Sequence, residues 1–271
     1  MAAESDRTTK VPGWYYPALA IQFLTRLPID LPGPINESHL VGSMGWYPLV
    51  GSLLGAFAAA CATGLTLCLP AHISAMISLI LLSVMTGNLH LDGLMDTADG
   101  FYGGHTVERR LEIMRDSRVG VHGVAAGVIA LLMQWSLLWT LLEDQRLLWA
   151  LPLALSAGRW SLVLAAKSQP PARKDGLGGM YATHLRPRHL LWATVAWIAV
   201  TSITVLVAAT QGTSARPYVQ GISAMATAAV VAAAFGRYAR KKIGGLTGDT
   251  LGATSTIVEL AVLLALVVGT R

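Results

Sequence analysis

The sequence predicts an all-α integral membrane protein, and two observations support this fold class. Apolar residues make up 54% of the 271-residue chain and charged residues only 13%, which is unlike a soluble globular domain. Seven apolar stretches also approach or exceed the roughly 20 residues that a helix needs to cross a bilayer. We therefore expect one polytopic helix bundle that forms a single domain over residues 1–271.

The predicted spans follow one another from residue 41 to residue 269. Ahead of them, residues 1–39 are too polar for the apolar core of a signal peptide, so we expect no cleavage. Within this cytoplasmic or interfacial segment, residues 14–29 mix aromatic and aliphatic side chains with Arg26, which favours an interfacial helix. The seven spans are expected at 41–68, 72–90, 119–142, 147–166, 189–210, 218–236 and 251–269.

Lysine and arginine are concentrated in alternate connections between the spans. With seven spans, all four rich segments lie on one side, so the positive-inside rule places the N-terminus in the cytoplasm and the C-terminus outside. We expect a protein of the cytoplasmic (inner) membrane whose chemistry faces the cytoplasm. This distribution explains the net positive charge without nucleic acid binding. The rich segments contain Arg7, Lys10 and Arg26; Arg109, Arg110, Arg115 and Arg118; Lys167, Arg173, Lys174, Arg186 and Arg188; and Arg237, Arg240, Lys241 and Lys242.

A run of carboxylates directly follows the second predicted span. On a helix, Asn88, Asp92, Asp96 and Asp99 fall within an arc of roughly 80°. Carboxylates at membrane depth are costly and usually functional, and a hard oxygen site of this kind suits Mg²⁺ bound together with substrate phosphates. The run therefore predicts a membrane enzyme that acts on a phosphate or pyrophosphate, with His90 as a base or a supporting hydrogen-bonding group.

A second acidic pattern follows after a glycine-rich break. Glu108, Glu112 and Asp116 are spaced at i, i+4 and i+8, which predicts a helix–loop–helix whose two acidic faces fold against each other. Asp116 would then complete the metal site or bind a second ion. Ordinary ion pairing on a surface helix is the alternative. Arg115 and Arg118 lie among these residues, and guanidinium groups suit phosphate oxygens.

Two further features suggest anion binding. Arg159 interrupts the fourth span and needs an anion, either a substrate phosphate or an acidic residue such as Glu259. The glycine-rich run before the last span exposes backbone N–H groups ahead of a helix and contains Asp249. A flexible junction is the alternative for this run. Its expected phosphate-binding residues are Gly244, Gly245, Thr247 and Gly248.

Five sequence blocks spread over most of the chain carry a family resemblance. They are residues 23–28 (FLTRLP), 47–51 (YPLVG), 90–100 (HLDGLMDTADG), 108–120 (ERRLEIMRDSRVG) and 244–253 (GGLTGDTLGA). In this order they resemble the cobalamin synthase family, the adenosylcobinamide-GDP ribazoletransferases. The acidic block at 90–100 and the block ending in the RDSRVG run are long and specific.

The resemblance implies the last joining step of the nucleotide loop of cobalamin. A ribose hydroxyl of α-ribazole, or of its 5′-phosphate, attacks the cobinamide-side phosphorus of adenosylcobinamide-GDP. GMP leaves, and adenosylcobalamin or its 5′-phosphate forms. Family members are Mg²⁺-dependent integral membrane proteins. The expected roles are Asp92, Asp96, Asp99 and Asp116 as Mg²⁺ ligands, a carboxylate such as Asp249 or His90 as the group that takes the hydroxyl proton, and Arg26, Arg115, Arg118 and Arg159 as substrate-binding residues.

Three other functions remain as alternatives. A membrane prenyltransferase needs a second Asp-rich helix, but only Asp175 and Asp249 follow Asp144. A CDP-alcohol phosphotransferase needs an Ala-Arg pair that the block at 92–97 lacks. A cation transporter would spread its carboxylates across the bilayer, whereas only Glu259 lies deep. The sequence leaves the oligomeric state open, a homo-oligomer included.

Overall fold

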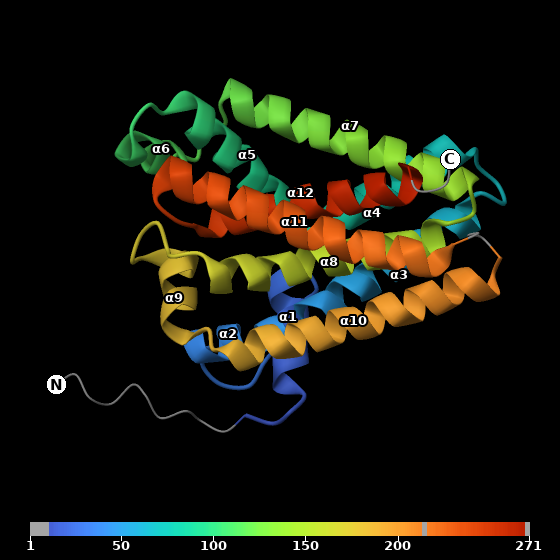
Figure 1. The fold of residues 1–271 in the computed structure, drawn as a ribbon, viewed down its shortest axis with the longest axis horizontal. Helices are drawn as coiled ribbons and strands as arrows, with labels where there is room; N and C mark the ends of the chain where they lie inside the picture. The colour runs from blue at the N-terminus through green and yellow to red at the C-terminus, as the bar shows by residue number, and fades with distance from the viewer. Residues whose placement is uncertain (1–10, 213–215, 269–271) are drawn as a thin grey trace.

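The computed structural model describes residues 11–212 and 216–268. This part of the chain is helical apart from one isolated β-bridge, so the predicted all-α class is confirmed (Figure 1). Six segments are long and apolar enough to cross a membrane, and a bent helix pair raises the number to as many as seven. Every predicted span corresponds to one of these segments or to the first half of the bent pair.

The long helices run side by side along the long axis of the molecule (Figure 1). The first is a continuous run over Glu37–Leu65, made of α2, a short 3-10 turn and α3. The others are α7 (Val121–Glu143), α8 (Leu147–Ser168), α10 (Pro187–Thr210), α11 (Pro217–Ile243) and α12 (Gly248–Val268). The shorter helices are α1 (Tyr15–Leu24), α2 (Glu37–Ser43), α3 (Tyr47–Leu65), α4 (Ala71–Thr86), α5 (Leu89–Gly103), α6 (Val107–Ile113) and α9 (Gly176–His184).

Helix α8 is the centre of the bundle. In its most apolar stretch 89% of the residues are buried, compared with 28% for α7. It packs against α3, α10, α11 and α12. A helix that is apolar on all sides and covered by other helices places any polar group it carries inside the protein, which applies to Arg159.

Helix α1 packs into the protein rather than only against the membrane surface. Tyr15, Leu19 and Leu24 on this helix are each at most 1% exposed. The helix contacts α2 and α3. A helix forms within residues 14–29, as the sequence predicts, and neighbouring helices cover its apolar face.

A sharp bend separates α4 from α5. The two helices meet at 87°, across Gly87 and Asn88, which both adopt left-handed backbone conformations (φ 60° and 58°). Glycine and asparagine are the residues that adopt this conformation at least cost. Asn88 is therefore outside the helix, and the predicted acidic face formed by Asn88 together with Asp92, Asp96 and Asp99 was wrong at its first residue.

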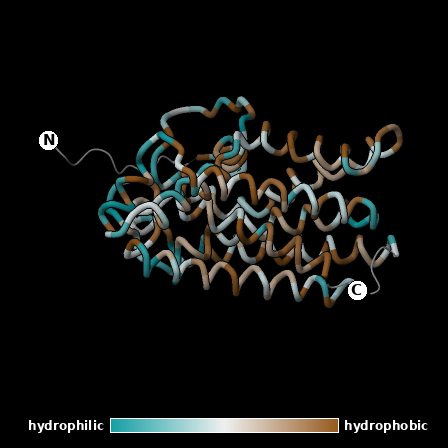
Figure 2. The backbone as a smooth tube through the Cα atoms, turned by 90° about the horizontal axis from the view of Figure 1, so that it is seen from above, coloured by the Kyte–Doolittle hydropathy of each residue, from teal (hydrophilic) through white to brown (hydrophobic). Residues whose placement is uncertain are grey.

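Hydrophilic segments gather at one end of the bundle. Figure 2 shows the hydrophilic colours densest at the left, while hydrophobic colours dominate along the helices. The same end carries α6, α9 and the junction between α11 and α12 (Figure 1). The connections predicted to be rich in lysine and arginine after the second, fourth and sixth spans therefore lie together.

Candidate active site

Helices α5 and α12 cross at close range. Gly93 on α5 lies against the main chain of Asp249 on α12, where a Cβ atom at position 93 would be only 2.6 Å from the Asp249 carbonyl oxygen. Gly252 lies against the backbone of His90 in a similar way. A larger side chain at position 93 would push the helices apart, so Gly93 permits two acidic segments from distant parts of the chain to meet.

Three carboxylates at this crossing repel one another. Asp96 experiences the negative charges of Asp92 and Asp249, and Asp249 also experiences that of Asp92. The Asp249 carboxylate accepts a 3.2 Å hydrogen bond from the Thr247 hydroxyl and lies 4.0 Å from the guanidinium of Arg173. Like charges held this close favour a bound cation.

A cavity of about 120 Å³ lies beside the crossing. Asp92, Asp249 and His90 form part of its wall, and Gly93 and Gly248 also line it. The rest of the wall is mostly apolar and includes aromatic rings from α1, α3 and α9. An apolar cavity with a few convergent polar groups is typical of a small-molecule site.

His90 also borders a second cavity, of about 60 Å³. Arg159 and Glu259 line this cavity, are 3% and 8% exposed, and form an ion pair with each other. The Ser255 hydroxyl donates a 2.9 Å hydrogen bond to the same Glu259 oxygen. Arg159 therefore has an acidic partner inside the protein, which is one of the two partners that the sequence left open.

Known proteins match this chain over nearly its whole length. The family model of cobalamin-5-phosphate synthase matches residues 17–267. The chain belongs to the cobalamin-5-phosphate synthase family. This finding confirms the resemblance predicted from the five sequence blocks.

Relatives named adenosylcobinamide-GDP ribazoletransferase cover the same length. The protein from Syntrophobacter fumaroxidans is 38% identical over 93% of this chain and 98% of its own length. Those from Roseiflexus sp. and Escherichia coli K12 are 34% and 33% identical, over 98% and 91% of this chain and 96% of their own lengths in both cases. No solved structure matches the chain significantly.

In this member of the cobalamin-5-phosphate synthase family, Asp99 has a different environment from Asp92 and Asp96. Its two carboxylate oxygens accept backbone hydrogen bonds from Gly120 (2.7 Å) and Gly123 (2.8 Å). These N–H groups belong to the first turn of α7, so Asp99 acts as a cap supplied by another helix. Asp99 is 7% exposed, and each of its carboxylate oxygens accepts a hydrogen bond from the backbone.

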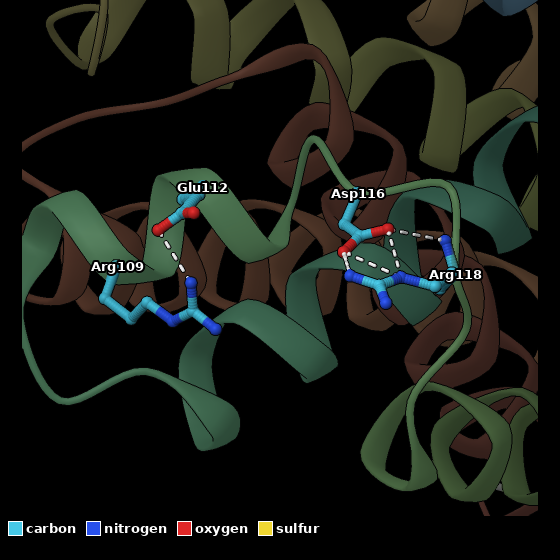
Figure 3. A network of polar contacts seen from close by, with 4 residues as sticks. All are labelled: Arg109, Glu112, Asp116 and Arg118. Atoms are coloured by element: carbon cyan, nitrogen blue, oxygen red, sulfur yellow. Dashed lines mark hydrogen bonds and ion pairs between the residues drawn. The ribbon is translucent and has the colours of Figure 1, made fainter.

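The predicted second acidic stripe does not form a continuous helical face. Helix α6 ends at Ile113, so Asp116 lies in the loop that follows. Figure 3 shows two separate ion pairs, Arg109 with Glu112 (2.7 Å) and Asp116 with Arg118 (2.6 Å). Surface ion pairing, the alternative considered from the sequence, describes this segment.

The contact between α5 and α6 is not acidic either. Met114 packs on Gly100, and the Arg110 guanidinium donates hydrogen bonds to the carbonyl oxygens of Gly104 (3.0 Å) and Lys242 (2.8 Å). The expectation that two acidic faces fold together was therefore wrong. Carboxylates repel one another when no cation lies between them. Here an apolar contact and a hydrogen bond from Arg110 to a backbone carbonyl hold α5 and α6 together.

The two remaining arginines, Arg115 and Arg26, contact different parts of the protein. Arg115 forms a 2.5 Å ion pair with Asp175, which connects the loop before α7 to the segment before α9. The Arg26 backbone donates a 2.7 Å hydrogen bond to the Met85 carbonyl, and its guanidinium lies against Gly87. Arg26 is thus at the start of α5, whereas Arg118 is engaged with Asp116.

The glycine-rich run uses several of its backbone donors internally. The N–H of Gly244 donates to Arg240, and that of Thr247 donates to the Thr250 hydroxyl at 2.8 Å. Gly245 packs against the backbone of residues 170–172. Within residues 244–251, the N–H groups of Gly245, Gly248 and Asp249 make no hydrogen bond to the described part of the protein, and those of Gly248 and Asp249 lie at the start of α12.

No three His, Cys, Asp or Glu side chains within residues 11–212 and 216–268 lie close enough to hold a metal ion by themselves. The four predicted ligands are therefore not gathered at one point. Mg²⁺ commonly takes only one or two protein carboxylates and completes its shell with water and substrate phosphates. The donor set of Asp92, Asp96 and Asp249 fits this mode of binding, since it consists of hard oxygens.

Arg173 was missed as a site residue because the sequence placed it only in a basic connection. A β-bridge between Pro171 and Leu246 brings its segment to the glycine-rich run. The bridge consists of hydrogen bonds from Leu246 to Pro170 and from Ala172 to Leu246, both 2.9 Å. Nothing local in the sequence predicts this pairing of segments that are about 75 residues apart.

Proposed function

We propose that the chain is a membrane-embedded adenosylcobinamide-GDP ribazoletransferase whose reaction takes place at the crossing of α5 and α12. The observation that carries this site assignment is the contact of Gly93 with Asp249, which joins the acidic block to the glycine-rich run. The reaction joins the cobinamide phosphate to the nucleoside and completes the nucleotide loop of cobalamin.

The chemistry is a phosphoryl transfer in which one bond forms and one breaks. The ribose hydroxyl oxygen of α-ribazole bonds to the cobinamide-side phosphorus, the pyrophosphate P–O bond breaks, and GMP takes the electron pair. A carboxylate among Asp92, Asp96 and Asp249, or His90, accepts the hydroxyl proton. The protein contributes mainly by positioning both substrates and stabilising the charge on the departing phosphate.

We infer that one or two of Asp92, Asp96 and Asp249 would hold Mg²⁺ together with phosphate oxygens of the substrate. Their mutual repulsion is evidence that the site favours a cation. When bound, Mg²⁺ neutralises charge on the pyrophosphate and favours the departure of GMP. Asp99 and Asp116 remain predicted ligands, but each would first have to leave its protein partners.

Phosphate binding in this proposal uses residues around the same crossing. The free N–H groups at the start of α12 and the guanidinium of Arg173 face the negative charge of the substrate. Arg26 lies at the bend just before the helix that carries Asp92, and the side chain of Arg115, which pairs with Asp175, is 54% exposed. We place this end in the cytoplasm, with the N-terminus inside and the C-terminus outside, on the basis of the basic connections.

The experiment that tests this function measures GMP release by purified protein in lipid nanodiscs. Adenosylcobinamide-GDP, α-ribazole and Mg²⁺ together should give GMP and an equal amount of adenosylcobalamin. Omission of α-ribazole, or addition of EDTA, should stop both products. GMP formed without the nucleoside would indicate hydrolysis instead of transfer, and no GMP under any condition would contradict the function.

A further inference from the structure

The larger cavity beside the carboxylates has two unlike walls. One wall carries Asp92 and Asp249. The rest of the lining is mostly aromatic and aliphatic, and several of these residues come from elements other than α5 and α12. These are Phe23 of α1, Met44 of the short 3-10 turn, Tyr47 at the start of α3, and Leu177 and Tyr181 of α9. We call this wall the aromatic chamber.

The rings of the aromatic chamber are fixed by packing. Phe23 and Tyr47 stack with their centroids 5.9 Å apart and an angle of 8° between their planes. Tyr47 and Tyr181 are 1% and 4% exposed. The chamber therefore presents flat, rigid surfaces, which select for a flat partner because they lose little conformational entropy on binding.

The chamber also holds a buried donor that lacks a good partner. The Tyr47 hydroxyl lies near those of Ser43 and Tyr181, yet it makes no hydrogen bond of good geometry. Burial raises the pKa of Tyr181 to about 12, so this hydroxyl keeps its proton at any physiological pH. Buried hydroxyls of this kind are available to an acceptor atom on a ligand.

The size of the cavity limits what can enter. Its volume of about 120 Å³ is comparable to that of the engineered apolar cavity, on the order of 150 Å³, that binds benzene. The cavity can hold a small flat aromatic ring system and is far too small for a corrin macrocycle. A negatively charged phosphate is also disfavoured on the aromatic side, since it would lose its hydration without a compensating cation.

We propose that the aromatic chamber binds the flat bicyclic base of the nucleoside acceptor, with the Tyr47 hydroxyl donating to the free ring nitrogen of the base. This orientation directs the attached ribose toward Asp92 and Asp249, where its hydroxyl meets the pyrophosphate. The inference rests on the proposed function for the identity of the nucleoside, but binding of the base can be measured without turnover.

The test uses one variant that fills the chamber and one that removes a donor. Leu177→Trp inserts an indole into the cavity, and Tyr47→Phe removes the hydroxyl that lacks a good partner. Loss of one hydrogen bond or of the ring pocket should weaken binding of α-ribazole about tenfold or more in either variant. Isothermal titration with α-ribazole alone, in EDTA, measures this binding. Leu53→Trp, on the exposed side of α3 (64% exposed), is the matched control.

Kinetics then separate the two substrates. In Leu177→Trp and Tyr47→Phe the KM for α-ribazole should rise, while the KM for adenosylcobinamide-GDP stays within about twofold of wild type. An increase in the KM for adenosylcobinamide-GDP alone would assign the chamber to that substrate and overturn the inference. Unchanged α-ribazole binding in both variants would also overturn it. If wild-type protein binds α-ribazole but releases no GMP, the proposed function fails while the chamber assignment stands.

Discussion

Arg159 of α8 and Glu259 of α12 form an ion pair in the interior of the bundle. The side chains are 3% and 11% exposed, and Gly158 gives Glu259 the space to approach α8. The pair ties the most buried helix to the helix that carries Asp249. His90 lines both the cavity that contains this pair and the cavity at the crossing of α5 and α12.

The first prediction concerns this ion pair. Arg159→Met or Glu259→Leu alone leaves an uncompensated buried charge and should destabilise the protein by roughly 3–5 kcal/mol. The double variant removes both charges and should recover most of the loss. Thermal unfolding in detergent measures stability, and binding of adenosylcobinamide-GDP to the same samples measures substrate recognition. If Arg159→Lys melts normally but binds this substrate poorly, the arginine contacts the substrate instead of acting as a structural partner.

The second prediction concerns the carboxylates at the crossing. Asp92→Asn, Asp96→Asn and Asp249→Asn each remove one charge with little change in shape. Each should lower the rate of GMP release by more than about 10²-fold, as expected when a group that stabilises transition-state charge is lost. Binding of Mn²⁺, followed by electron paramagnetic resonance, should weaken in parallel. Glu108→Gln, on the exposed surface of α6, should change neither quantity; near-normal activity in two of the three variants would mean that the cluster is structural.

The third prediction separates Asp99 from these carboxylates. Asp99→Asn turns an amide N–H₂ toward the backbone donor of Gly120 or Gly123, so one capping hydrogen bond is lost. We expect a loss of about 0.5–2 kcal/mol in stability, as for other helix caps. Activity per folded molecule should fall much less than in Asp92→Asn. The exposed Asp30→Asn is the control for the same chemical change, and a 10²-fold loss of activity without destabilisation would restore Asp99 as a metal ligand.

The fourth prediction concerns pH. Hydrogen bonds from Arg118 lower the pKa of Asp116 from 3.8 to about 2. A lowered pKa means that any contribution of this pair is complete above about pH 3.8 and disappears only as the pH falls through about 2. Asp116 therefore cannot cause an acidic limb of the rate profile near neutral pH. The profile of kcat/KM between pH 5 and 9 should keep its shape in Asp116→Asn; disappearance of an acidic limb in this variant would show that Asp116 titrates during catalysis.

The fifth prediction concerns orientation in the membrane. In a chain with Cys61 and Cys68 replaced by alanine, a cysteine at exposed Lys174 should react with an impermeant thiol reagent only after the cells are opened. A cysteine at Gly212, at the opposite end of the bundle, should react in intact cells. The reverse pattern of labelling would place the N-terminus outside and would contradict the assignment made from the basic connections.

The predicted spans agreed with the structure because hydropathy is a local property of the sequence. The same holds for the helix at residues 15–24 and for the position of the acidic block on α5. Sequence patterns described the helix ends less well. Because α6 ends at Ile113, Asp116 lies outside the expected stripe. Because the chain bends at Gly87, Asn88 lies outside the acidic face.

The composition of the site depended on contacts between distant segments. Asp92 and Asp249 line one cavity although 157 residues separate them in the numbering of the chain. Arg173 reaches the same place through the bridge of Pro171 with Leu246. These contacts depend on how the helices and their connections pack against one another, and the periodicity within one helix does not predict that packing.

The sequence by itself determined that the chain is a helical membrane protein, which segments are its helices, and which family it belongs to. Only the tertiary structure decided which charged residues remain available for chemistry. In the tertiary structure Asp99 caps the first turn of α7 and Glu259 pairs with Arg159, because unpaired helix ends and buried charges each need a partner. Asp92 and Asp249 line the cavity that contains the aromatic chamber, since the close approach at Gly93 brings α5 and α12 into contact there.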